Sequence, residues 1–341
     1  MFRKVFKYFI CMEIISLFLT TILLDNPAKA EAGRVTRISG ADRYITAAQI
    51  ATTNWRNSDN VVLVSGEGYA DAVSASVLAK KLDAPILLTP SNALDANTKE
   101  ALAELEAKKI YIIGGNASIS QNVRDCLKSK YTLIELGGSN RYETNISVDK
   151  ELIRLGVDPT NIIMASGEGF SDALSTAPIA SSEEQILLLA NNDINYMKST
   201  INFVKSNNSK VTVVGTEEVI NDEIFNAVNG TLRVNGGADR FDTNLKVLSK
   251  FSSSLNFNNM YIVNASSDDG YADALVASVL AGKNKSPLIL LDSDGASSTT
   301  NAIKFTRDNI NRMSDITVIG GTGVISNNIF DQINKCFPCI Y

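Results

Sequence analysis

The chain of 341 residues contains no histidine, and its 32 basic and 37 acidic side chains give a net charge of −5. Without histidine, a Ser-His-Asp triad, a Cys-His pair and a histidine-ligated zinc hydrolase are all excluded. The acidic balance argues against nonspecific binding to nucleic acids, which depends on a basic surface. An anionic partner would have to be held by local groups against an unfavourable overall field.

Residues 1–30 are predicted to be a secretory signal peptide. Arg3, Lys4 and Lys7 form a basic start, residues 14–24 are apolar, and Ala28-Lys29-Ala30 offers a small-x-small cleavage site. A retained membrane anchor is the less favoured alternative, because the apolar run is too short for an ordinary spanning helix. We therefore expect a secreted protein that has no contact with the membrane after cleavage.

Beyond this segment, strands and helices alternate without a hairpin signal. Continuous apolar runs such as residues 61–64 are typical of strands buried on both faces, and Asp42 is placed to cap a helix. We expect strands at 35–38, 61–64, 86–88 and 110–113, helices at 44–55, 71–82, 99–107 and 123–128, and a strand at 133–136 that we assign to the next unit. This alternation predicts a parallel α/β sheet with helices on both faces.

Blocks of sequence recur at a period of about a hundred residues, the size of a small domain rather than of a solenoid repeat. The first block, G-x-x-R-[YF]-x-T, occurs at 40–46, 138–144 and 237–243. The second, S-G-E-G-[YF]-x-D-A with S-D-D-G in the third copy, occurs at 65–72, 166–173 and 267–274. Apolar trios follow at 86–88, 187–189 and 288–290, and glycine-containing blocks at 112–115, 213–216 and 319–321.

The repeats predict three tandem modules, at residues 31–132, 133–231 and 232–341. Each is expected to be a small parallel sheet flanked by helices. Since no Gly/Ser/Pro-rich linker separates them, we expect the modules to pack against each other around a pseudo-threefold axis. Extended beads are the alternative.

The G-x-x-R loops are candidate anion sites, because each follows a strand and opens a helix, where backbone N–H groups favour negative charge. An arginine adds a permanent charge with a fork geometry that suits phosphate or carboxylate. The alternative is an arginine paired with a nearby aspartate of the second block, and these aspartates are also expected to cap their helices. The residues are Gly40, Gly138, Gly237, Arg43, Arg141 and Arg240, with Asp71, Asp172 and Asp273 as the aspartates.

The second block also resembles the start of a toprim-type metal site, which needs a further Asp-x-Asp after the next strand. The third unit has Asp292 and Asp294 there but carries Asp269 in place of the glutamate. No unit retains the full carboxylate set, so we expect a toprim-like topology without a metal, a cofactor or catalytic residues. Cys336 and Cys339 have C-x-x-C spacing close to the C-terminus, and we interpret them as a tail, with a local disulfide as one alternative.

Taken together, these blocks resemble the cell-wall-binding type 2 repeat of Gram-positive, especially clostridial, surface proteins. The resemblance implies three toprim-like modules in a pseudo-trimer that hold a secreted protein non-covalently on the cell wall. It implies an anionic wall polysaccharide or teichoic-acid-like polymer as the partner, contacted or shaped by Arg43, Arg141 and Arg240. Surface-layer proteins would be neighbours there. Asp268, Asp269 and Thr216 depart from the family pattern, and no effector domain is recognised.

Two functions are therefore weighed. The favoured one is a non-enzymatic wall-binding protein whose three modules raise avidity. The alternative is a wall-modifying enzyme, either a peptidoglycan hydrolase or a metal-dependent hydrolase using Asp269, Asp292 and Asp294.

Overall fold

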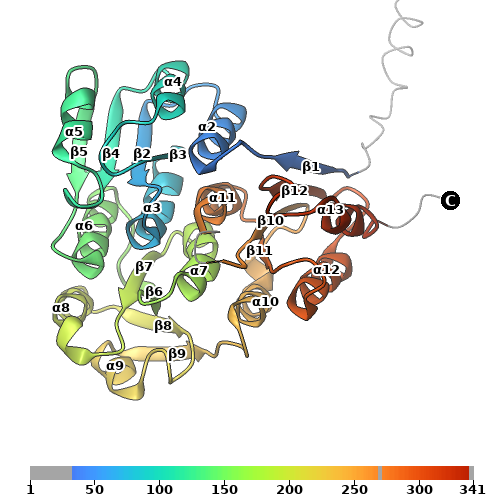
Figure 1. The fold of residues 1–341 in the computed structure, drawn as a ribbon. Helices are drawn as coiled ribbons and strands as arrows, with labels where there is room; N and C mark the ends of the chain where they lie inside the picture. The colour runs from blue at the N-terminus through green and yellow to red at the C-terminus, as the bar shows by residue number, and fades with distance from the viewer. Residues whose placement is uncertain (1–32, 268–270, 338–341) are drawn as a thin grey trace, which may run out of the picture. The chain divides into compact units, whose positions relative to one another are not determined.

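The structure, a computed structural model, describes residues 33–267 and 271–337, without the side chains of residues 69–72. The predicted signal peptide lies outside the described residues. Within them, no helix has both the length and the apolar character needed to cross a membrane. Strands and helices alternate along the described residues, as Figure 1 shows.

The described residues form three four-stranded sheets in which all paired strands are parallel. Each central strand is almost wholly buried, which explains its continuous run of apolar side chains. The first sheet has the order β3 (Ile86–Thr89), β2 (Asn60–Ser65), β4 (Lys109–Ile113) and β5 (Thr132–Leu136). The second is β7 (Ile186–Ala190), β6 (Asn161–Ser166), β8 (Lys210–Val214) and β9 (Gly230–Val234), and the third is β11 (Leu288–Leu291), β10 (Asn259–Asn264), β12 (Asp315–Ile319) and β1 (Val35–Ile38).

The fourth strand of each sheet comes from another sequence repeat. β5, which we assigned to the second unit, pairs with β4 of the first sheet in a register that joins Glu135 to Ile112. β9 likewise completes the second sheet, and β1, near the beginning of the described chain, pairs with β12 near its end (Figure 1). β5 therefore completes the sheet of the first repeat, although the second match to the repeated sequence begins within it, at residue 135.

Helices flank each sheet, and their bounds lie within a few residues of those predicted. The first repeat contains α2 (Arg43–Asn54), α3 (Tyr69–Lys81), α4 (Ala96–Glu104) and α5 (Gln121–Lys128). The second contains α6 (Arg141–Arg154), α7 (Phe170–Ser182), α8 (Lys198–Ser206) and α9 (Asp222–Ala227), and the third α10 (Arg240–Lys250), α11 (Tyr271–Lys283), α12 (Ser297–Asn309) and α13 (Asn327–Asn334). Short 3-10 turns lie at Ile194–Tyr196 and Ser252–Ser254.

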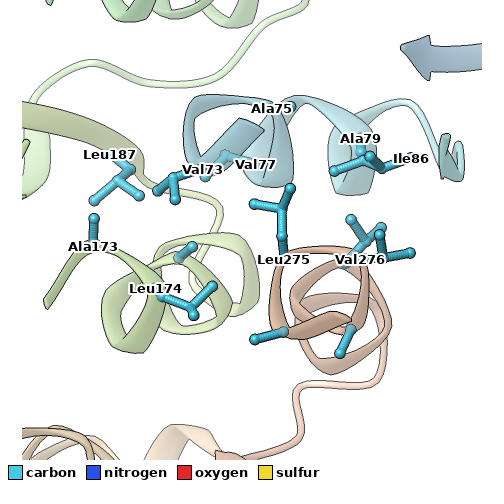
Figure 2. Packing of buried hydrophobic residues seen from close by; sticks show 14 of the residues in the cluster. Val73, Ala75, Val77, Ala79, Ile86, Ala173, Leu174, Leu187, Leu275 and Val276 are labelled. Atoms are coloured by element: carbon cyan, nitrogen blue, oxygen red, sulfur yellow. The ribbon is translucent and has the colours of Figure 1, made fainter. Parts of the chain in front are cut away.

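The three repeats meet through α3, α7 and α11, each of which packs on the other two. Figure 2 shows Val73 of α3 beside Leu187 of β7, with Leu174 of α7 and Leu275 of α11 on the two helices that face α3. Small residues let these helices approach closely, since a Cβ added at Gly282 of α11 would lie 2.4 Å from the Cβ of Ser181 in α7. This contact explains the alanine-rich composition of the three helices, which a helix exposed to solvent on one face would not need.

Asparagine side chains cover the outer edge of two apolar trios. Asn145 of α6 donates to the carbonyl of Leu187 and accepts from the N–H of Leu189, both at 2.8 Å. Asn244 of α10 makes the same pair of bonds to Leu288 and Leu290, both at 3.0 Å. These bonds satisfy buried backbone groups that an edge strand would otherwise leave unpaired. The first repeat has Ala47 at the corresponding position.

Candidate functional site

The G-x-x-R loops begin helices through internal hydrogen bonds. Asp42 caps α2, as predicted, by accepting from the N–H of Ile45 at 2.8 Å. The N–H of Gly40 donates to the Thr46 hydroxyl at 3.0 Å, and Gly138 and Gly237 bond their own threonines in the same way. A Cβ at Gly40 would lie 2.5 Å from the Ile45 side chain, so this close turn requires glycine. Because these N–H groups already have acceptors, the loop backbone is a weaker anion site than its position at a helix N-terminus suggested.

Each motif arginine ties its loop to the end of the next strand. The guanidinium of Arg43 donates to the carbonyl of Gly66 at 2.6 Å, and that of Arg141 to the carbonyl of Gly167 at 2.5 Å. Arg240 does the same to Ala265 at 3.3 Å. The first and second sequence blocks of one repeat are thereby held together by a charge-assisted bond.

Two of these arginines, Arg43 and Arg240, contact the preceding repeat, with the third repeat preceding the first. The guanidinium carbon of Arg43 lies 5.8 Å from the ring centre of Tyr271, and that of Arg240 lies 4.7 Å from the ring centre of Phe170. The Tyr271 hydroxyl also donates to the carbonyl of Gly66, at 3.2 Å. Cation–π contacts of this kind favour a guanidinium over an ammonium. Arg43 and Arg240 therefore lie at junctions between repeats.

Two of these junctions contain an open pocket, which we call a junction pocket. The pocket between repeats three and one has a volume of about 390 Å³ and is lined by Gly40–Arg43, Thr46, Ala272, Asp273 and residues 321–324. The pocket between repeats two and three has a volume of about 650 Å³ and is lined by residues 236–240, Thr243, Ser166, Glu168, Gly169, Ser171, Asp172, Thr216, Glu218 and Val219. Each pocket thus joins the first block of one repeat to the second and glycine-containing blocks of the repeat before it.

Asp172 and Asp273 line these junction pockets but do not cap their helices as predicted. The cap position of α7 is Gly169, and both aspartates lie in the first turn, within the helix. Burial raises the pKa of Asp172 to about 6. Burial also raises the pKa of Asp273 to about 6, although the positive charge of Arg43 acts in the opposite direction. The side chain of Asp71 lies outside the described residues.

These two carboxyls should make stability depend on pH. Their folded pKa lies above the ordinary value of 3.8, so stability is fully present below pH 4 and is lost as the pH rises toward 6. We expect the double variant Asp172→Asn, Asp273→Asn to gain stability over the wild type between pH 4 and pH 7, by on the order of 3 kcal/mol per site. Urea unfolding across this range measures the gain. An unchanged difference between the two proteins at all pH values would contradict it, and exposed Asp331→Asn is the control.

A second set of arginines, which the sequence analysis missed, shapes the glycine-containing turns. Arg37 of β1 donates to the carbonyls of Gly320 and Ile325, at 2.7 and 3.0 Å. Arg233 of β9 donates to the corresponding carbonyls of Gly215 and Ile220, at 3.3 and 2.8 Å. Each stacks on a phenylalanine of a short helix. The guanidinium carbon of Arg37 lies 4.8 Å from the ring centre of Phe330 in α13, and that of Arg233 lies 4.9 Å from the ring centre of Phe225 in α9.

In the first repeat the arginine that binds the glycine-containing turn comes from the short helix and not from the edge strand. Arg124 of α5 donates to the carbonyls of Gly114 and Ile119, at 2.9 and 3.1 Å, and pairs with Glu135 of β5 at 2.7 Å. Glu135 occupies the register position of Arg37 and Arg233, and Arg124 replaces the phenylalanine. The sequence does contain a signal for this ion pair. Between the first and second repeats the strand residue changes from Glu135 to Arg233, and the helix residue changes from Arg124 to Phe225.

The carboxylates proposed for metal chemistry have other partners. Glu168 accepts from the side chain of Asn191 at 3.2 Å and from the N–H of Asn192 at 3.3 Å. Asp292 accepts from Ser298 at 2.8 Å, and Asp294 accepts from Ser326 at 2.7 Å. Among the described residues, which exclude Asp269, no three Asp, Glu, Cys or His side chains come together as a metal site. These carboxylates instead fix the loops that follow neighbouring strands.

Of the two cysteines in the C-x-x-C spacing, the structure describes Cys336 alone. Cys336 is buried, and burial raises the pKa of its thiol. Cys339 lies outside the described residues. A disulfide between them therefore stays a prediction.

The model of the family described as cell wall binding domain 2 matches the chain three times, at residues 37–124, 135–225 and 234–330. The chain belongs to this family. It is 30% identical over 327 residues to the N-acetylmuramoyl-L-alanine amidase LytC of Bacillus subtilis, covering 95% of this chain and 62% of LytC. It is 28% identical to the amidase enhancer of the same organism, covering 87% of this chain and 40% of the enhancer.

Two solved structures share the fold. Cwp6 from Clostridium difficile has a TM-score of 0.80 and 26% identity, covering 92% of this chain and 49% of Cwp6. Cwp8 from the same organism has a TM-score of 0.77 and 22% identity, covering 94% of this chain and 54% of Cwp8. The chain therefore spans about half to two thirds of the length of LytC, Cwp6 and Cwp8. The three-repeat α/β fold of parallel sheets and helices is the one that these proteins contain.

Proposed function

We propose that this member of the cell wall binding domain 2 family anchors itself on a Gram-positive cell wall by binding an anionic secondary wall polymer at the junctions between its repeats. The observation that carries the proposal is the position of the motif arginines. Arg43 and Arg240 lie at open pockets where loops of two successive repeats meet. A guanidinium that is oriented by a backbone carbonyl and an aromatic ring presents its charge in a fixed direction.

Three equivalent junctions would act together. We infer a pseudo-threefold arrangement, supported by the mutual packing of α3, α7 and α11 and by the strand that each repeat supplies to the preceding sheet. A long polymer that engages several junctions at once gains avidity without high affinity at any single one. The net acidic charge of the chain makes such local sites necessary for an anionic ligand.

The likeness to the amidase LytC does not by itself imply hydrolase activity. The family model matches residues 37–124, 135–225 and 234–330, which make up most of the aligned region, and it describes wall binding. We therefore propose a secreted, non-enzymatic binding protein located at the cell wall.

Blocking the junctions should release the protein from walls. We expect the triple variant Ala41→Trp, Ser139→Trp, Ala238→Trp to lose at least about a hundredfold in apparent affinity, and single variants several-fold, because these exposed positions border the motif arginines without contributing to their bonds. Co-sedimentation with purified cell walls measures this, before and after the anionic polymers are chemically stripped. Unchanged retention of the folded triple variant, or unchanged binding to stripped walls, would sink the proposal.

A further inference from the structure

A groove between α6 and α8 of the second repeat has no motif arginine in its lining, although it reaches Gly138 of the G-x-x-R loop. It has a volume of about 720 Å³, within the range of small-molecule sites. Buried Ile146 and Phe203 form an apolar floor. The polar lining consists of Ser147, Lys150, Ser199, Asn202, Ser206 and Asn207, and residues 137, 138, 143 and 153 complete the groove.

The first repeat differs from the second at this helix pair. α4 and α8 are each followed by a residue with positive φ, Glu106 and Asn208, and alignment on these two residues places Ala101 of α4 where α8 has Phe203. The aromatic ring that lines the groove therefore has no counterpart in α4.

The polar side chains of this groove are available to a ligand. Within the described ranges, Ser147, Ser199, Asn202, Ser206 and Lys150 make no side-chain hydrogen bond or ion pair with another residue. This contrasts with the G-x-x-R loops, whose N–H groups have acceptors of their own. Four neutral hydrogen-bonding groups and one ammonium therefore face a single concave surface with an apolar floor.

The acidic residue at this groove is engaged elsewhere. The Glu143 carboxylate accepts from the N–H of Ser139 at 3.0 Å and from the Ser139 hydroxyl. These bonds hold the pKa of Glu143 below its ordinary value, so it remains charged but directed at Ser139. Lys150 is then the charged group in the lining that has no partner among the described residues.

We propose that this groove binds a saccharide that carries an anionic substituent. Sugar hydroxyls and acetamido groups would exchange hydrogen bonds with the serines and with Asn202, the apolar face of a sugar ring would lie on Phe203 and Ile146, and Lys150 would pair with the anion. The proposal rests on the proposed function for its ligand class and adds a second site to it, which is argued from the groove alone.

Two defined oligosaccharides test the site on the full chain: a hyaluronan tetrasaccharide, which carries carboxylates, and neutral chitotriose. Titration calorimetry should show the tetrasaccharide binding about tenfold more tightly. Lys150→Gln should remove this preference, whereas Lys198→Gln, an exposed lysine of the same helix pair, should keep it. Ser206→Trp should abolish binding of both, and Ser129→Trp, exposed at the end of α5, should leave it unchanged.

Binding of neither probe by the wild type, or wild-type binding by a folded Ser206→Trp variant, would overturn the proposal. Equal affinity of the wild type for both probes would overturn the role of Lys150. The double variant Ala41→Trp, Ala238→Trp separates this site from wall anchoring, because it leaves the bonds between Ser139 and the groove-lining Glu143 intact. If only the anchoring proposal fails, this variant still binds the tetrasaccharide and also remains on walls.

Discussion

Replacing Asp149 by leucine is expected to raise the free energy of unfolding by about 3 kcal/mol at pH 7. Asp149 lies on α6 with 1% of its surface exposed, and its Oδ2 has no hydrogen-bond partner among the described residues. Burial raises the pKa of this carboxyl well above its ordinary value. The other repeats place fully buried apolar residues at the same distance from the motif arginine, Ala51 and Leu248.

The gain should depend on pH with a defined sign. Because the folded pKa of Asp149 is raised, the wild type has this part of its stability below about pH 4 and loses it as the pH rises. The advantage of Asp149→Leu should therefore be large at pH 7 and small at pH 4, as measured by urea unfolding. Asp149→Ala, which copies Ala51, should shift in the same direction. Exposed Asp331→Leu should change stability by less than about 0.5 kcal/mol.

A loss of stability in Asp149→Leu at pH 7 would show that the carboxylate makes a favourable interaction. The position would then be one where the second repeat has acquired a role that the other two lack. A gain in the free energy of unfolding would show that the apolar residue found at this position in the other repeats also stabilises the second repeat.

The second large effect on stability is expected from moving the arginine that binds the glycine-containing turn from the edge strand to the short helix. Arg233→Glu should lower the free energy of unfolding by about 3 kcal/mol, because it places a carboxylate beside the carbonyl oxygens of Gly215 and Ile220. Adding Phe225→Arg should restore part of this loss, since an arginine at this position in the first repeat binds the corresponding carbonyls and Glu135. We expect a favourable coupling of about 1–3 kcal/mol.

Urea unfolding of the two single variants, the double variant and the wild type gives this coupling as a double-mutant cycle. The reciprocal exchange in the first repeat, Glu135→Arg with Arg124→Phe, is the matched test. Additive effects in both cycles would mean that the strand and helix positions do not interact, and that their joint change between repeats is coincidental.

Internal repetition made much of the architecture predictable. The three blocks around Arg43, Arg141 and Arg240 fix the number of units, and the apolar runs fix the parallel strands, because a strand buried on both faces needs apolar side chains throughout. Asp42 was correctly predicted as a helix cap, since its interaction with Ile45 is local in sequence. The family followed from the same blocks.

Interactions between distant residues were harder to predict. Asp172 and Asp273 looked like helix caps by their spacing, but the helices begin earlier, at Phe170 and Tyr271, and the carboxyls are buried in the first turn. Asn145 pairs with backbone groups at the edge of β7, and no local sequence pattern predicts its hydrogen bond to Leu187. The N–H groups of the G-x-x-R loops also proved to be bonded within the loops, because the threonine that ends the motif folds back onto the glycine.

By itself, the sequence determined that this protein is a threefold repeat of small parallel α/β units with an arginine at the start of each, because repetition and buried-strand composition are local properties of the chain. Tertiary structure alone decided which strand completes each sheet and which residues meet at the junctions between repeats. β1 completes the sheet of the third repeat, and Arg43 reaches the ring of Tyr271. Strand pairing and junction contacts join residues far apart in the chain, and their partners are set by the packing of α3, α7 and α11 rather than by any neighbouring residue.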